Sequence, residues 1–170
     1  MSLKQRLMEK KASITASWRD TALAVPAGAR FDFLEKQRSI VDAMGSGLVQ
    51  GMSGLFDALL QGGIPNDVSR FLDIMVRIRA SNDFTASQAV TFLIEVKKII
   101  RRELGSDGLA DAPLREELSA WDSAVDDLVL FAFDLYARSR ENVLDANAAE
   151  ESRKTLLLLK KAKLLPDDEL

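Results

Sequence analysis

The longest stretch of this chain without a helix-breaking residue begins at Pro113 and continues to about Lys163. Proline is favoured in the first turn of a helix, and no glycine or further proline follows it within this stretch. A helix of about fifty residues would be about 75 Å long at 1.5 Å per residue, which exceeds the diameter of a domain of this size. We therefore expect a final helix that either bends after about Asn142 or projects from the domain as a stalk.

Four earlier segments repeat apolar residues at helical spacing. Breaks separate them, with the letters V-P-A-G at 25–28 and G-G-I-P at 62–65. The predicted helices are Leu3–Leu23, Arg38–Gln61, Asn66–Ser81 and a fourth that opens with a capping box at Thr85 and ends before Gly105. Together with the final helix they predict an all-α bundle of about five helices. We expect residues 1–145 to form a helical regulatory domain and residues 146–170 a helical or mobile tail.

Four glycines lie in or beside the first half of the second helix, at Gly45, Gly47, Gly51 and Gly54. Each costs about 0.5–1 kcal/mol against alanine in a helix interior, so their presence needs a reason. Close packing of two helices is the interpretation we favour, and a local break that lines a ligand pocket is the alternative. A phosphate-binding loop is excluded, because no G-K-[ST] follows and no strand precedes them.

The chain contains no cysteine and no histidine, which excludes several kinds of chemistry. Disulfides, thiolate nucleophiles, zinc sites of the Cys/His type and a histidine general base are all impossible. The net charge of −3 argues against a nucleic-acid partner. The one basic run, which contains Lys97, Lys98, Arg101 and Arg102, is more typical of a solvated helix face than of a phosphate-binding patch. The charged N-terminus and the absence of a long apolar run predict a cytoplasmic protein without a membrane contact.

Arg79 is the first candidate site residue, because helical periodicity places it between Leu72 and Met75 in the apolar arc. Asp134 is the candidate partner, since it is the one charged residue in L-V-L-F-A-F-D-L-Y at 128–136. A charge inside an apolar face is costly unless it is paired. We favour an ion pair that fixes the helix register; the alternatives are a small polar pocket for an anion or metabolite, and simple exposure of both side chains. Arg138 lies four residues after Asp134 and can pair with it along one helix.

The other candidate residues flank these two. Arg77 is predicted on the opposite face from Arg79, and Phe133 points away from the core and could contact a second subunit. The remaining candidates lie at the start of the fourth helix or after the apolar run of the last helix; they are Asp83, Ser87, Gln88, Arg140 and Glu141.

The pattern R-I-R-A-x-x-D-F-x-x-S-Q-A followed by A-F-D-x-Y-x-x-x-R-E resembles the N-terminal domain of RsbRD-type proteins, the co-antagonists of bacterial stress signalling. The resemblance implies a helical regulatory domain without catalytic activity. Some relatives have sensor domains like globins without haem, which implies a haem-free globin-like arrangement here. Haem itself is not expected, because the chain has no histidine or cysteine ligand and methionine alone is a weak axial ligand. The only tyrosine is Tyr136, which is predicted on the core side. We expect no other cofactor.

In that family this domain commonly precedes a STAS domain, whereas the present sequence ends at Leu170. The expected function is therefore a regulatory or sensory module that binds a partner protein or a small ligand, with a homodimer through the final helix as one form of that contact. The alternative is a stand-alone accessory or assembly protein of a larger metabolic or redox enzyme complex that docks through its tail.

Overall fold

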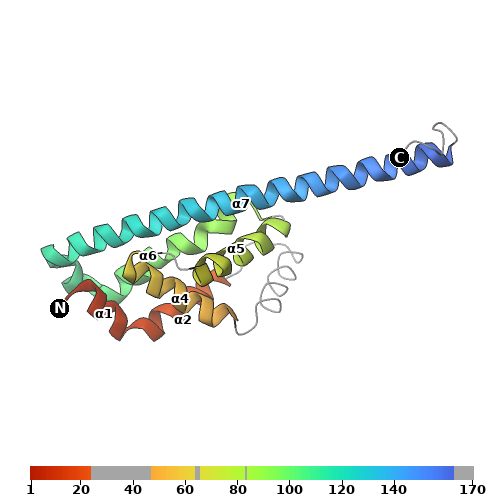
Figure 1. The fold of residues 1–170 in the computed structure, drawn as a ribbon. Coiled ribbons are helices and arrows are strands. Elements are labelled where there is room, and N and C mark those ends of the chain that lie inside the picture. The colour runs from red at the N-terminus through yellow and green to blue at the C-terminus, as the bar shows by residue number, and fades with distance from the viewer. Residues whose placement is uncertain (24–46, 64–65, 83, 163–170) are drawn as a thin grey trace.

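The computed structural model describes residues 1–23, 47–63, 66–82 and 84–162. These residues form six α-helices and contain no strand, which confirms the all-α prediction. The shorter helices gather on one side of the long α7 (Ala112–Lys161), whose last part extends past them (Figure 1). No helix among the described residues is long and apolar enough to cross a lipid bilayer.

The first predicted helix is divided in two, α1 at Leu3–Glu9 and α2 at Lys11–Ala22. The break is at Lys10, whose φ is −103° and whose ψ is 8°. The ammonium group of Lys10 donates to the backbone carbonyl of Glu103 and lies 3.4 Å from its carboxylate, so the break brings this lysine to α6 (Ala86–Ala110). The predicted stripe is correct, since its five residues are buried; they are Leu3, Leu7, Ile14, Trp18 and Ala22.

Helices α4 (Gly47–Gln61) and α5 (Asn66–Ser81) pack against each other through a glycine. A methyl group added at Gly51 would overlap the ring of Phe71. The packing interpretation therefore holds at Gly51, because only a residue without a side chain fits there. We expected this helix to begin at Arg38. Residues 38–46, which include Gly45, lie outside the described part of the chain.

Helix α6 (Ala86–Ala110) begins with the predicted capping box. The hydroxyl of Thr85 accepts from the backbone of Gln88, and the side chain of Gln88 accepts in return from the backbone of Thr85. Gly105 interrupts the helix with a φ of 66°, a conformation that favours glycine. The predicted end of this helix before Gly105 is wrong in part, since the backbone returns to helix after Gly105 and continues to Ala110.

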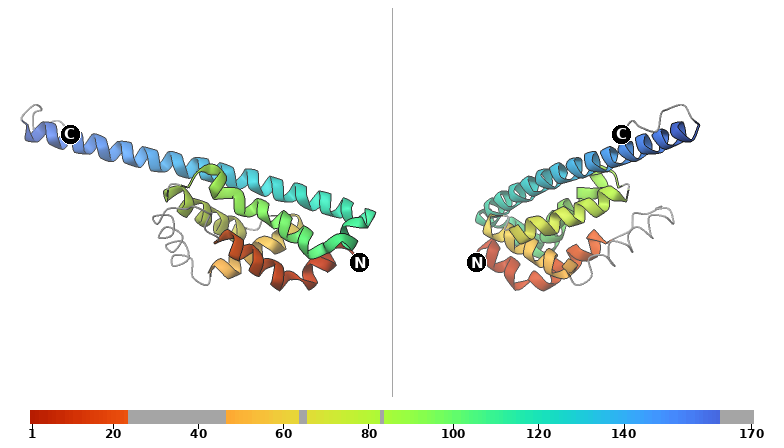
Figure 2. Two further views of the ribbon diagram at one scale, coloured as in Figure 1. Left: turned by 180° about the vertical axis from the view of Figure 1, so that it is seen from behind. Right: turned by 45° about the vertical axis from the view of Figure 1, so that its right-hand side comes forward.

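Helix α7 (Ala112–Lys161) runs without interruption for 50 residues. Its first half lies along α5 and α6 in both views of Figure 2. Two ion pairs join it to α6, from Lys97 to Asp126 at 2.7 Å and from Arg101 to Asp122. Ser139 is its last buried residue. Of the two arrangements we considered for this helix, the stalk is the one formed.

One hydrophobic core joins all six helices. Trp18 of α2 is fully buried in it, and its indole nitrogen donates to the carbonyl of Phe92 in α6 at 2.7 Å. Buried indole groups normally find such a partner. This bond fixes α2 against the middle of α6, next to the residues of the predicted polar site.

Candidate functional site

Arg79 is buried, with 3% of its surface exposed, but its partners are not the ones we predicted. One terminal nitrogen donates to the carbonyl of Ala22 at 2.8 Å, and the other donates to the carbonyl of Ala89 at 3.0 Å. Ala22 is the last residue of α2, where carbonyls lack an intrahelical partner. Arg79 therefore ties the end of α2 and the first turns of α6 to α5.

Aromatic rings cover the face of the same guanidinium. Its central carbon lies 4.3 Å from the ring centre of Phe92 and 5.9 Å from that of Phe84. Burial lowers the pKa of Arg79 to about 10, because removing the cation from water disfavours its charged form. Two carbonyls and an aromatic face compensate part of this desolvation. The arrangement is that of a structural cation.

The predicted pair between Arg79 and Asp134 is not formed. Asp134 is exposed, and no carboxylate among the described residues forms an ion pair with Arg79. The reason is that α7 has an outward face even within its apolar run, and Asp134 lies on that face. Arg138 is exposed as well, and its Nε approaches the backbone carbonyl of Asp134 at 3.4 Å instead of the carboxylate.

Two residues of the second motif do reach the predicted region. The hydroxyl of Tyr136 donates to the carbonyl of Phe84 at 2.6 Å, and the guanidinium of Arg140 donates to the carbonyl of Ala80 at 3.0 Å. Both carbonyls belong to the last turn of α5 or to the connection that follows it. The motif residues therefore hold the junction between α5 and α6 against α7. Our sequence reasoning had given Tyr136 no such role.

The other candidates are dispersed over the surface. Arg77 pairs with Asp73 along α5, and it shares a groove of about 480 Å³ with Arg138 of α7. Ser87 is exposed in the first turn of α6, beside the capping box that contains Gln88.

Two candidates lie on the free surface of α7, and one cannot be placed. Phe133 is 48% exposed, as expected for a side chain that points away from the core. Glu141 is also exposed. Asp83 lies outside the described residues. No cluster of side chains suited to a metal ion occurs among the residues that the structure describes.

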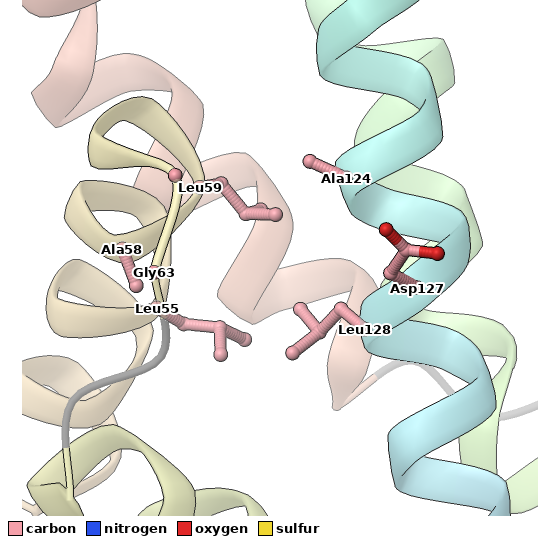
Figure 3. A pocket seen from close by; sticks show the side chains of 8 residues that line it. Leu55, Ala58, Leu59, Gly63, Ala124, Asp127 and Leu128 are labelled. Carbon is pink, nitrogen blue, oxygen red and sulfur yellow. The ribbon is translucent and has the colours of Figure 1, made fainter.

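A cleft of about 230 Å³ lies between α4 and α7, away from all these residues. Leu55 and Leu59 of α4 face Leu128 of α7 across it (Figure 3). Its other lining residues are Ala58, Gly62, Gly63, Ala124 and Asp127. The sequence indicated Gly62-Gly63 only as a helix end. It could not indicate the cleft, since a cleft depends on how far apart two helices pack.

Residues 12–150 match the family described as the RsbT co-antagonist protein rsbRD N-terminal domain. The match covers most of the chain, and the protein belongs to this family of bacterial stress-signalling regulatory domains. No curated protein and no solved structure matches the chain, so the predicted globin-like arrangement remains a prediction.

Proposed function

We propose that this protein is a non-catalytic signalling module that acts through protein–protein contacts made by α7, and that a second copy of the chain is one partner. The exposed half of α7 carries the proposal. Beyond Ser139 the helix buries no residue against the described part of the chain, yet it continues to Lys161. Most of the stability of protein helices comes from tertiary packing, so a partner would stabilise this part of α7.

The exposed leucines of α7 favour an identical helix as that partner. Leu130, Leu144 and Leu158 are 65%, 58% and 66% exposed. They follow one another at intervals of fourteen residues, which is two heptads. In a parallel two-fold pair each residue meets its own copy, so each leucine would pack on the same leucine of the other chain. Phe133, three residues after Leu130, extends the same seam.

Charged residues within this seam oppose association: Glu151 lies in the column of Leu130, and Lys154 lies in the column of Phe133. The positions seven residues apart are Leu130, Ala137, Leu144, Glu151 and Leu158. Glu151 would face its own copy, and like charges directly opposed are destabilising. We therefore expect a reversible dimer in the micromolar range, in keeping with a regulatory contact rather than a permanent one.

Substitutions in the seam should change the association in opposite directions. Leu144→Glu or Phe133→Glu should shift sedimentation toward monomer, and Glu151→Leu should shift it toward dimer. Ala149→Glu adds the same charge on an exposed face about 140° from Leu144, and it should leave the association unchanged. A wild-type monomer at micromolar concentration would contradict the dimer.

Because the chain has no cysteine, single cysteine variants report the orientation without background. In a parallel pair, Leu158→Cys should form a disulfide with its own copy under mild oxidation. An antiparallel pair would instead join Leu130→Cys to Leu158→Cys when the two variants are mixed. The alternative function, an accessory protein of a larger enzyme complex, predicts a monomer whose α7 docks on a different protein.

A further inference from the structure

We propose that the cleft between α4 and α7 is a binding site for a small organic cation with an apolar body, of the class of alkyl- and arylammonium ions. The cleft is about 230 Å³ and opens to solvent at the end of α4. It takes no part in the α7 seam of the proposed dimer, because Ala124 and Leu128 face α4 while Leu130 and Phe133 are exposed on another face.

The apolar side chains that line the cleft favour a ligand whose larger part is apolar. Leu55, Leu59 and Leu128 supply aliphatic surface from two helices, and the alanines beside them leave room (Figure 3). An apolar cavity of about 150 Å³ lined by similar side chains takes up benzene. The larger volume here therefore fits a single ring with a short substituent.

Asp127 supplies the charge at the edge of the cleft. Three aspartates lie close together on α7, and two of them are neutralised by α6, Asp122 by Arg101 and Asp126 by Lys97. Asp127 lines the cleft instead and forms no ion pair with the described residues. Its carboxylate is thus available to a ligand that enters from solvent.

The end of α4 adds to the same preference. Gly62 and Gly63 both donate to the carbonyl of Ala58, so the C-terminal end of the helix lies at the cleft. The C-terminal end of a helix carries partial negative charge, which favours a cation. Asp127 lies on the opposite side of the cleft. Its carboxylate and the end of α4 both favour a positive charge, whereas the leucine side chains favour an apolar ligand body.

Gly62 and Gly63 leave the entrance of the cleft unobstructed, because they have no side chains. A methyl group added at either one would meet no atom within 4 Å. Gly62 has a φ of 75°, which disfavours any other residue, but Gly63 has an ordinary backbone conformation. A leucine at position 63 should therefore be tolerated by the fold and should occupy the space that a ligand needs.

Three probes of the same shape and different charge test the site: benzylammonium, benzyl alcohol and benzoate. Binding is followed by the amide NMR signals of Gly62 and Gly63 as each probe is added to the full chain. We expect saturable shifts with benzylammonium in the millimolar range usual for so small a ligand. Benzyl alcohol should bind about two- to fivefold more weakly, as the loss of one exposed ion pair predicts, and benzoate more weakly still.

Three variants separate this site from general surface attraction. Asp127→Asn should reduce the preference for benzylammonium over benzyl alcohol to the smaller part that the end of α4 supplies, while Asp126→Asn, which removes a neighbouring carboxylate outside the cleft, should preserve it in full. Gly63→Leu should prevent binding of all three probes with unchanged helicity and unchanged sedimentation. The proposal is overturned if no probe shifts the glycine signals, or if the cation preference is as large in Asp127→Asn as in the wild type. Neither result would bear on the α7 dimer, which sedimentation tests separately.

Discussion

The guanidinium of Arg79 lies 4.3 Å from the ring centre of Phe92, inside the junction of α2, α5 and α6. Arg79 also donates to two carbonyls from different nitrogens, a geometry that depends on its planar fork. We expect Arg79→Lys to lower the free energy of unfolding by about 2–3 kcal/mol, because a lysine has one nitrogen and cannot reproduce both bonds and the ring contact. Urea denaturation at a fixed protein concentration measures this loss.

A double-mutant cycle isolates the ring contact. Arg79→Met and Phe92→Leu together should be less destabilising than the sum of the single changes, with a coupling of about 0.5–2 kcal/mol. The cycle with Phe84→Leu is the control, since that ring is 5.9 Å away and should couple less. Equal coupling in both cycles would mean that the stacking on Phe92 contributes nothing specific.

A double-mutant cycle for Arg79 and Asp134 should show no coupling. Because Asp134 is exposed and forms no ion pair with Arg79, the effects of Arg79→Met and Asp134→Leu on the free energy of unfolding should add within about 0.5 kcal/mol. Asp134→Leu alone should change stability by no more than about 0.5 kcal/mol. A coupling well above this value would show that the two side chains meet in solution.

The lowered pKa of Arg79 predicts a dependence of stability on high pH. Below about pH 10 both the folded and the unfolded chain carry the proton, and the folded state bears the full desolvation cost. Above about pH 10 the folded chain loses a proton that the unfolded chain keeps up to its higher, ordinary arginine pKa, so the contribution of this residue to stability rises with pH.

The comparison between wild type and Arg79→Met isolates this effect from the titration of lysines. From about pH 9 to about pH 11, the free energy of unfolding of the wild type should rise relative to that of the variant by about 1 kcal/mol. Urea unfolding of both proteins at the two pH values measures the difference. Parallel changes in the two proteins would mean that Arg79 keeps an ordinary pKa in the fold.

The helices could be predicted because each one shows its buried face directly in the periodicity of its apolar residues. The break at Lys10 could not be predicted, since lysine is a good helix former and the contact that Lys10 makes after the break is with Glu103, ninety-three residues away. The burial of Arg79 was readable from its place in the apolar arc. The hydrogen-bond acceptors of Arg79 could not be predicted, because every residue has a backbone carbonyl. The packing of α2, α5 and α6 determines that the carbonyls of Ala22 and Ala89 are the ones it reaches.

The glycines of α4 provide a matched test of helix packing. Gly51→Ala should destabilise the protein by about 1–3 kcal/mol, because the new methyl group overlaps the buried ring of Phe71 and α4 must move away from α5. Gly47→Ala is the control: the added methyl group meets nothing within 4 Å, and it should leave stability unchanged or raise it by up to about 1 kcal/mol. Thermal unfolding of the two variants followed by circular dichroism distinguishes them. If both substitutions stabilise the protein alike, Gly51 is not a contact point, and the separation of α4 from α5 must be set by other side chains.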